Sequence, residues 1–216
     1  MINTTIKKTF DLAFQNHKKN NFQIAENLYK EALKTNPNHF KSIYYLGTLL
    51  AQTKKFDLAK LLFHKAIQIQ PNYAMAHNNL GNVLSELGQH QKAISSYEKA
   101  IQINPNYAFA HNNLGLVFNQ LGELQKAISS FEKAIQINPN YVLAYNNLGK
   151  VFGELNEFNK SANYYEKALK LDPNLKETCG GYGNLLLKFN QHSKALSYIK
   201  KSTGFISFTQ KDFKII

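Results

Sequence analysis

The chain has 216 residues, of which 44% are hydrophobic, and it carries a formal net charge of +12. This hydrophobic fraction is typical of a globular protein and excludes a disordered chain. All 26 basic residues are lysine, and none is arginine. Arginine is the preferred residue for bidentate contacts with bases and phosphates. Its absence argues against a sequence-specific nucleic-acid reader, so we expect no nucleic-acid partner despite the positive charge.

Cysteine usage and hydropathy exclude several further classes of protein. A single cysteine, Cys179, rules out an internal disulfide and any metal cluster built from cysteines. Residues 1–14 include scattered charges and lack the apolar core of a secretory signal. No stretch approaches the 18 or so apolar residues that a transmembrane helix needs. We therefore expect a cytoplasmic protein without a metal or another cofactor.

The five prolines reveal an internal repeat, because they lie 34 residues apart along the chain. They are Pro37, Pro71, Pro105, Pro139 and Pro173. Aligned on this period, the chain divides into the six units 6–39, 40–73, 74–107, 108–141, 142–175 and 176–209. The third and fourth units are identical at 26 of 34 positions, whereas the last unit is degenerate. Self-similarity at such a period predicts a repeat architecture.

Each unit has the pattern of two helices separated by a turn. In the third unit, apolar residues recur at helical spacing over 74–87 and again over 91–103. Gly88 is placed to end the first helix, and Pro105 to end the second. Glycine at position 81 and tyrosine at position 97 recur as a small and an aromatic residue in most other units. The small residue allows two helices to approach closely, and the ring fills the wider gap beside it.

This pattern resembles the tetratricopeptide repeat, whose signature combines a 34-residue period with W-x2-L-G-x2-Y, A-x3-F and P. In the third unit His77 stands at the position of the tryptophan and Leu84 at that of the tyrosine. The third unit matches the signature at Leu80, Gly81, Ala93, Tyr97, Ala100 and Pro105. The resemblance covers residues 6–202, and the repeats are similar to those of O-linked N-acetylglucosamine transferases. It implies an all-α fold, a right-handed α–α superhelix of about six helix-turn-helix repeats. Its concave groove would be lined by the first helix of each unit.

The resemblance also implies that the groove binds an extended peptide or a helix of a partner protein. The candidate groove residues are Met75, Asn78, Asn79, Asn82, Phe109, Asn112, Asn113, Leu116, Leu143, Asn146, Asn147 and Lys150. The repeated asparagines suit main-chain recognition, because a side-chain amide offers both donors and an acceptor. The alternative interpretation is that the asparagines hold the neighbouring repeat. Asn79, Asn113 and Asn147 are the stronger candidates for contact with a peptide.

No catalytic group of residues emerges, and we expect a protein-interaction scaffold rather than an enzyme. His77 and His111 lie one repeat apart, which is too far to share a metal, so we expect them to pack within the fold. Groove lysines are few and widely spaced, which argues against a clamp for a carboxylate. Lysine rows on the second helices, from Lys92 and Lys99 onward, are interpreted as a solvated face. The alternative function is an accessory segment of a glycosyl- or methyltransferase whose catalytic domain is absent from this chain.

The C-terminal segment 203–216 departs from the repeat and alternates apolar and polar residues, which favours strand over helix. Two interpretations are open. The segment either caps the last repeat through Phe205, Ile206 and Phe208, or it is the remnant of a lost domain. The glycines of residues 179–183 are expected to loosen the first helix of the sixth unit.

Overall fold

The computed structural model describes residues 2–204, 207–208 and 213–214 and forms two compact units, Met1–Ala110 and His111–Ile216. Each unit is described by itself. The N-terminal unit contains α1 (Ile2–Lys18), α2 (Phe22–Thr35), α3 (Phe40–Gln52), α4 (Phe56–Ile69), α5 (Ala74–Glu86) and α6 (His90–Ile103). The unit boundary lies in the first turn of α7 (Ala108–Gln120). The C-terminal unit continues with α8 (Leu124–Ile137), α9 (Val142–Glu154), α10 (Phe158–Leu171), α11 (Lys176–Lys188) and α12 (His192–Thr203).

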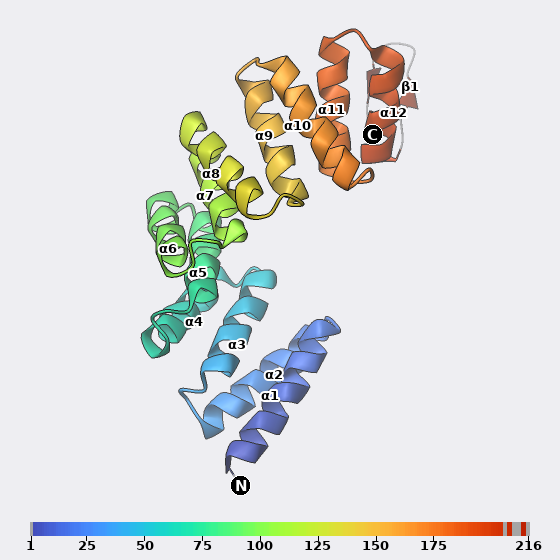
Figure 1. The fold of residues 1–216 in the computed structure, drawn as a ribbon. Helices are drawn as coiled ribbons and strands as arrows, with labels where there is room; N and C mark the ends of the chain where they lie inside the picture. Colours follow the sequence, from blue (N-terminus) through green and yellow to red (C-terminus); the bar gives the residue numbers. More distant parts are fainter. Residues whose placement is uncertain (1, 205–206, 209–212, 215–216) are drawn as a thin grey trace. The chain divides into compact units, whose positions relative to one another are not determined.

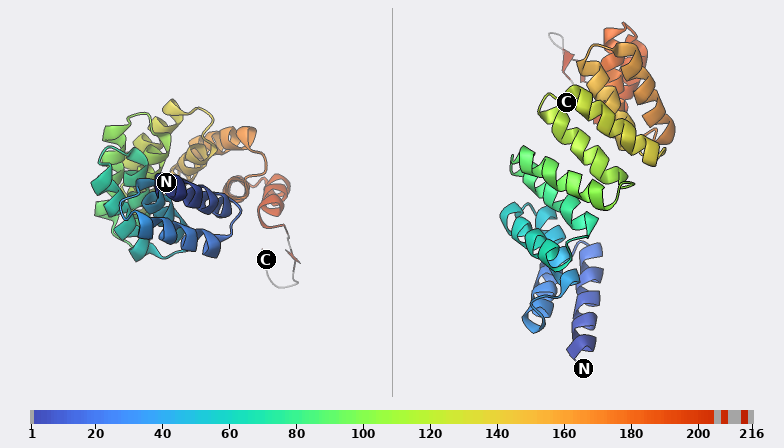
Figure 2. Two further views of the ribbon diagram at one scale, coloured as in Figure 1. Left: turned by 90° about the horizontal axis from the view of Figure 1, so that it is seen from below. Right: turned by 60° about the vertical axis from the view of Figure 1, so that its left-hand side comes forward.

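The helices form antiparallel pairs, and each pair corresponds to one 34-residue repeat (Figure 1). Within the N-terminal unit, α1 packs on α2, α3 on α4 and α5 on α6, and each pair packs on the next. The C-terminal unit repeats this arrangement, with α9 on α10 and α11 on α12 (Figure 2). The expected all-α fold of helix-turn-helix repeats is therefore confirmed. The expected helices at 74–87 and 91–103 differ from α5 and α6 by one residue at one end each.

The turn between the two helices of each repeat contains one residue with a left-handed backbone. It is Asn20, Lys54, Gly88, Gly122, Asn156 or Asn190, with φ between 57° and 74°. Two hydrogen bonds close this turn in the third repeat. The Gly88 N–H donates to the carbonyl of Ser85, and the Gln89 N–H donates to the carbonyl of Leu84. The two bonds satisfy carbonyls that the end of α5 would otherwise leave unpaired. Gly88 thus ends the helix as expected.

The small residue of the first helix lies directly against the aromatic ring of the second helix. A Cβ placed on Gly81 would lie 2.6 Å from Cε1 of Tyr97, closer than real atoms approach. The same conflict arises between Gly115 and Phe131, and between Gly149 and Tyr165. Glycine is required at these positions because the ring occupies the space of a side chain. This confirms the pairing of small and aromatic residues expected from the sequence.

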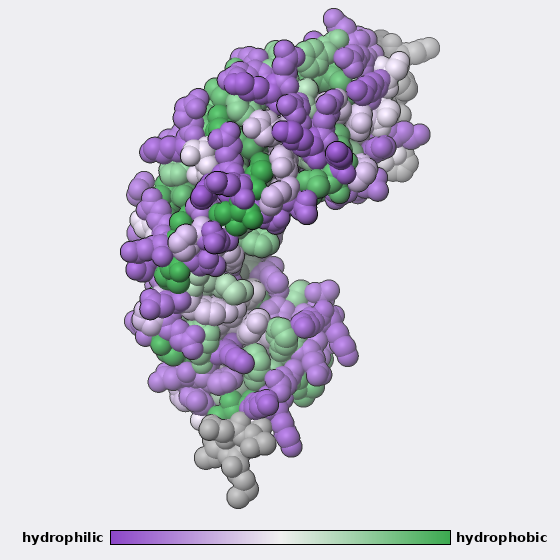
Figure 3. Space-filling view, in the orientation of Figure 1, coloured by the Kyte–Doolittle hydropathy of each residue, from purple (hydrophilic) through white to green (hydrophobic). Residues whose placement is uncertain are grey.

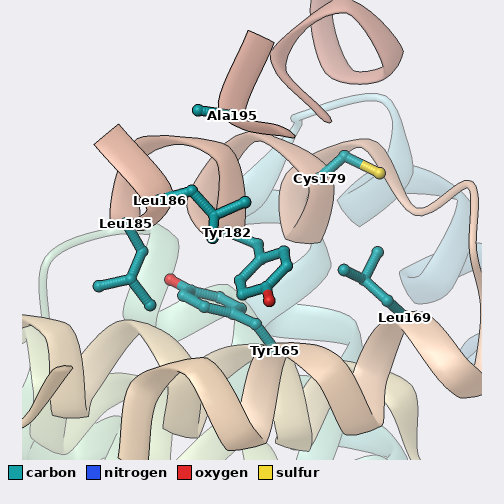
Figure 4. Packing of buried hydrophobic residues seen from close by; sticks show 7 residues of the cluster. All are labelled: Tyr165, Leu169, Cys179, Tyr182, Leu185, Leu186 and Ala195. Carbon is teal, nitrogen blue, oxygen red and sulfur yellow. The ribbon is translucent and has the colours of Figure 1, made fainter. Parts of the chain in front are cut away.

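The first helix of the sixth repeat is continuous, and the expectation that its glycines loosen it stays a prediction. The helix α11 is continuous over Lys176–Lys188 and buries Cys179, Tyr182, Leu185 and Leu186. Figure 4 shows Tyr182 beside Tyr165 of α10, with ring centroids 6.3 Å apart. A Cβ on Gly181 would lie 2.7 Å from the Tyr165 hydroxyl oxygen. The packing of neighbouring helices opposes the low helix propensity of glycine.

Beyond α12, which is followed by Gly204 with a φ of 82°, the chain forms two short antiparallel strands. They are β1 (Ser207–Phe208) and β2 (Phe213–Lys214), and Phe208 pairs with Phe213. This agrees with the strand-like pattern of the sequence. Phe205 and Ile206, two of the residues expected to cap the last repeat, lie outside the described residues, so the cap stays a prediction.

Candidate functional site

Large apolar side chains are exposed on the first helices of the repeats. Met75 of α5 is 44% exposed and Phe109 of α7 is 56% exposed, both in the N-terminal unit. Leu143 of α9 is 45% exposed in the C-terminal unit, at the equivalent repeat position. Leu116 of α7, another candidate groove residue, lies seven residues after Phe109 and is 39% exposed. In each unit, we call the exposed side chains of its first helices the first-helix surface of that unit: α3, α5 and the start of α7 in the N-terminal unit, and the rest of α7, α9 and α11 in the C-terminal unit.

In two of the three Asn-Asn pairs of the repeats, the adjacent asparagines lie in different environments. Asn78 and Asn112 are buried, at 4% and 3% exposure, beneath the first-helix surface. Their neighbours Asn79 and Asn113 are half-buried, and in the third pair Asn146 and Asn147 are both half-buried. Consecutive residues on a helix point about 100° apart, so one amide faces inward while its neighbour reaches the surface. Of the candidate asparagines, Asn78 and Asn112 therefore lack the exposure that contact with a ligand requires.

The half-buried asparagines bond to the first helix of the preceding repeat. The amide nitrogen of Asn79 donates to the Tyr44 hydroxyl, 35 residues earlier, at 3.0 Å. In the C-terminal unit, the amide nitrogen of Asn147 donates to Oδ1 of Asn112, again 35 residues earlier and at 3.0 Å. We call such side-chain bonds between neighbouring first helices rungs. The interpretation that the asparagines hold the neighbouring repeat is thus supported, through side chains rather than through the backbone.

Two further rungs join other neighbouring repeats. A ring nitrogen of His17 lies 2.7 Å from Oε1 of Gln52, which joins α1 to α3. The Thr178 hydroxyl donates to Oδ1 of the half-buried Asn146 at 3.0 Å, which joins α11 to α9. No motif in the sequence singles out His17, Gln52 or Thr178. Their repeat positions are not those of the asparagines, so the asparagine pattern does not indicate them.

The rung at Asn79 leaves part of its amide available. Its nitrogen uses one hydrogen on Tyr44, and its oxygen accepts one bond from the Asn78 amide at 3.3 Å. An amide has two N–H donors and two acceptor lone pairs. Burial raises the pKa of Tyr44, so its hydroxyl is neutral and accepts the bond in its protonated form. Asn79 can therefore hold the neighbouring repeat and still offer one donor and one acceptor to a ligand.

A hollow of about 370 Å³ opens between α3 and α5 in the N-terminal unit. Its lining includes Thr48, Ala51, Gln52, Phe63, Asn82 and Glu86. A second hollow, of about 420 Å³, lies at the equivalent place between α9 and α11 in the C-terminal unit. Its corresponding residues, 102 positions later, are Lys150, Gly153, Glu154, Tyr165, Asn184 and Lys188. The candidates Asn82 and Lys150 thus line equivalent hollows.

His77 and Cys179, at the same repeat position, have structural surroundings. Nε2 of His77 lies 2.8 Å from the carbonyl of Pro71, and Sγ of Cys179 lies 3.6 Å from the carbonyl of Pro173. Burial raises the pKa of the Cys179 thiol, which disfavours the reactive thiolate. Both contacts satisfy the carbonyl of the proline that ends the preceding repeat, in agreement with the expected packing role.

The lysines of the second helices lie in solvent. Lys126 and Lys160 are more than half exposed and pair with Glu123 and Glu157, three residues earlier. Figure 3 shows hydrophilic side chains spread over the visible face, with hydrophobic ones between them. Short-range pairs of this kind contribute little and reduce the local positive potential. The geometry agrees with a solvated face.

Antiparallel helix pairs with a 34-residue period define a helical-repeat protein. The family model of the tetratricopeptide repeat matches residues 40–106, 72–140 and 106–174, which together cover more than half of the chain. The chain belongs to the tetratricopeptide repeat family. Such repeats are typically modules for protein interaction and generally act as scaffolds or adaptors rather than catalysts.

Solved structures share this fold. MamA is 29% identical with a TM-score of 0.68, over 78% of this chain and 92% of MamA. PilF of Pseudomonas aeruginosa is 21% identical with a TM-score of 0.80, over 91% of this chain and 90% of PilF. YrrB, a tetratricopeptide protein with an unusual peptide-binding site, is 21% identical with a TM-score of 0.64, over 82% of this chain and 95% of YrrB. No curated protein matches the sequence. Among the described residues, no helix has both the length and the apolar character needed to span a bilayer.

Proposed function

We propose that the first-helix surface of the N-terminal unit binds an extended segment of a partner protein. The observation that carries this proposal is the exposure of Met75 and Phe109, large apolar side chains at one repeat position. Transfer of such a side chain out of water contributes about 1.5–3 kcal/mol when burial is complete. A bound segment that covered them would gain part of this energy.

The asparagine amides supply contacts that do not depend on the sequence of the segment. Asn79 and Asn147 each use an N–H on the preceding repeat, which fixes the orientation of the amide. An amide that is already oriented loses little entropy when its second N–H meets a peptide carbonyl. The peptide-binding site of YrrB, a protein of the same fold, supports the same use here.

The charge distribution favours an uncharged segment. The helices α3, α5 and α7 contain only two charged residues, Lys41 and Glu86, whereas α4, α6 and α8 contain three each. An acidic tail would find few lysines on the first-helix surface of these repeats. Binding there should depend weakly on salt, because ionic strength screens only charged contacts.

The proposal can be tested with peptides selected from a random twelve-residue library displayed on phage, with the full chain as bait. The test variant is Met75→Asp with Phe109→Asp. The matched control is Leu58→Asp with Leu61→Asp, which alters side chains on α4 that are 53% and 63% exposed. We expect selected peptides to bind the test variant at least tenfold more weakly and the control with unchanged affinity.

Failure to select any peptide, or equal loss of affinity in both variants, would contradict the proposal. Native partners captured from the host distinguish the alternative function, because a stable complex with a transferase would indicate an accessory segment. That alternative, the cytoplasmic location and the lack of a nucleic-acid partner stay predictions from the sequence.

A further inference from the structure

The hollow between α3 and α5 has an apolar floor. Phe63 and Val83 lie at the bottom of it and are almost fully buried, at 0% and 1% exposure. Ala51 and Phe56 are partly buried at its side. Its volume of about 370 Å³ is within the range of sites that take small ligands. A single large side chain of a bound segment could enter it.

The polar atoms around the hollow are largely engaged within the chain. The Thr48 hydroxyl donates to the carbonyl of Tyr44 at 3.0 Å, and Oε1 of Gln52 lies 2.7 Å from a ring nitrogen of His17. Oδ1 of Asn82 accepts from the Tyr97 hydroxyl at 2.8 Å. These groups need no charged ligand to satisfy them. The favourable free energy of binding in the hollow therefore comes from the removal of apolar surface from water.

We propose that this hollow anchors one uncharged, apolar side chain of the bound segment, of the size of leucine. The inference rests on the proposed function and specifies which repeats recognise the partner and by what chemistry. The two charged residues of the lining, Lys54 and Glu86, have opposite signs, so the hollow has no net charge that would attract an ionised side chain. An ionised side chain would lose hydration here and would meet a like charge of the lining as well as an opposite one.

The equivalent hollow in the C-terminal unit has the same position but different chemistry. Lys150 stands where the first hollow has Thr48, and Lys188 stands where it has Glu86. Glu154 offsets one of these lysines, and the hydroxyl of Tyr165 replaces the plain ring of Phe63. The preference for an apolar side chain is therefore a property of the second and third repeats. The C-terminal hollow serves as an internal control.

The experiment uses the full chain labelled with ¹⁵N and three small probes: N-acetyl-leucine amide, N-acetyl-lysine amide and N-acetyl-aspartic acid amide. We expect the leucine probe to shift the backbone amide resonances of Ala51, Asn79 and Val83 at millimolar concentration. The charged probes should shift them at least fivefold less. The same panel is applied to Ala51→Leu, which fills the hollow, and to the control Gly153→Leu, which fills the equivalent one.

The variant Ala51→Leu is expected to fold, because Leu187 occupies the same position in the sixth repeat. Its far-ultraviolet circular dichroism should match that of the wild type. In this variant the shifts caused by the leucine probe should disappear, while Gly153→Leu should leave them unchanged. Equal shifts from the leucine and aspartate probes, or shifts that persist in Ala51→Leu, would overturn the inference.

Binding of the selected peptides separates this inference from the proposed function. If the peptides require Met75 and Phe109 but bind Ala51→Leu as tightly as the wild type, the anchor is refuted and the binding surface stands. If they bind Ala51→Leu at least tenfold more weakly and Gly153→Leu normally, the anchor is supported. A Glu86→Lys variant should then shift the preference of the hollow from the leucine probe toward the aspartate probe.

Discussion

The side-chain amide of Asn147 donates a hydrogen bond to the side-chain oxygen of Asn112, 35 residues earlier, over 3.0 Å. The two residues occupy successive repeats, and Asn112 is only 3% exposed. The sequence offers two Asn-Asn pairs of identical appearance here. In the structure, the second member of one pair bonds to the first member of the other.

Removal of this rung should destabilise the C-terminal unit. Asn147→Ala leaves the buried oxygen of Asn112 without its donor, and an unsatisfied buried acceptor costs about 1–3 kcal/mol. Urea unfolding followed by circular dichroism measures the change. The control Asn163→Ala removes an exposed asparagine of α10 and should change the stability by less than about 0.5 kcal/mol. Equal stability of the two variants would show that the rung carries no energy.

Alanine should have opposite effects at two glycines of the first helices. At Gly81 a Cβ would lie 2.6 Å from the ring of Tyr97, so Gly81→Ala should cost about 1–3 kcal/mol through overpacking. At Gly153 the nearest atom to a Cβ is Oγ of Ser161, at 3.4 Å. There the higher helix propensity of alanine should stabilise the protein by about 0.5–1 kcal/mol. Thermal and urea unfolding of both variants check the signs, and two changes in the same direction would contradict the packing argument.

Glu26 should make the stability of the N-terminal unit depend on pH. Its carboxylate accepts from Lys30 at 2.6 Å and from Lys55 at 3.0 Å, and these bonds lower the pKa of Glu26, although burial partly opposes them. Because the folded-state pKa lies below the unfolded value of about 4.3, the stabilisation is complete above that value. It is lost as the pH falls through the folded-state pKa.

The comparison with Glu26→Gln tests this linkage. At neutral pH the variant should be less stable than the wild type, and the difference should shrink as the pH falls from about 5 toward 3. Both lysines are about half exposed, so the difference should also decrease in high salt. Urea unfolding over this pH range provides the measurement. Parallel stability curves would mean that the ion pairs do not contribute.

Lys54 is the exception at the left-handed turn position, where every other repeat has glycine or asparagine. A side chain with a Cβ is disfavoured in this conformation by about 1–2 kcal/mol, and Lys54 has a φ of 58°. Lys54→Gly should therefore stabilise the N-terminal unit by about 0.5–1 kcal/mol, after allowance for the greater freedom of glycine in the unfolded chain. The reciprocal variant Gly88→Lys should destabilise it. If Lys54→Gly lowered the melting temperature, the lysine would have to make compensating contacts.

The repeat architecture could be predicted because the residues that end its helices act through local backbone conformation. Gly88 and Pro105 mark helix ends through backbone conformation, which does not depend on tertiary contacts. The ends of α5 and α6 were accordingly found within one residue. Gly81 and Tyr97 could be paired because a helix pair with a fixed turn sets which positions face each other.

Which asparagines of the candidate site are buried, and which bond to the neighbouring repeat, could not be predicted. Asn78 and Asn79 are chemically identical neighbours, and the sequence does not show that Asn78 is buried while Asn79 donates to Tyr44 of the preceding repeat. The shape of the hollow likewise depends on the rotamers of the side chains that line it, which the repeat period does not specify. At Gly181 the low helix propensity of glycine did not indicate that the space left by its missing side chain is taken by the hydroxyl of Tyr165.

The rungs also determine how the protein unfolds. They join the first repeat to the second, the second to the third, the fourth to the fifth and the fifth to the sixth. A repeat that opens alone must break side-chain bonds on its flanks as well as its own packing, which strengthens the coupling between nearest neighbours. Under heat or mechanical load, neighbouring repeats should therefore melt together as a block rather than peel off one helix at a time.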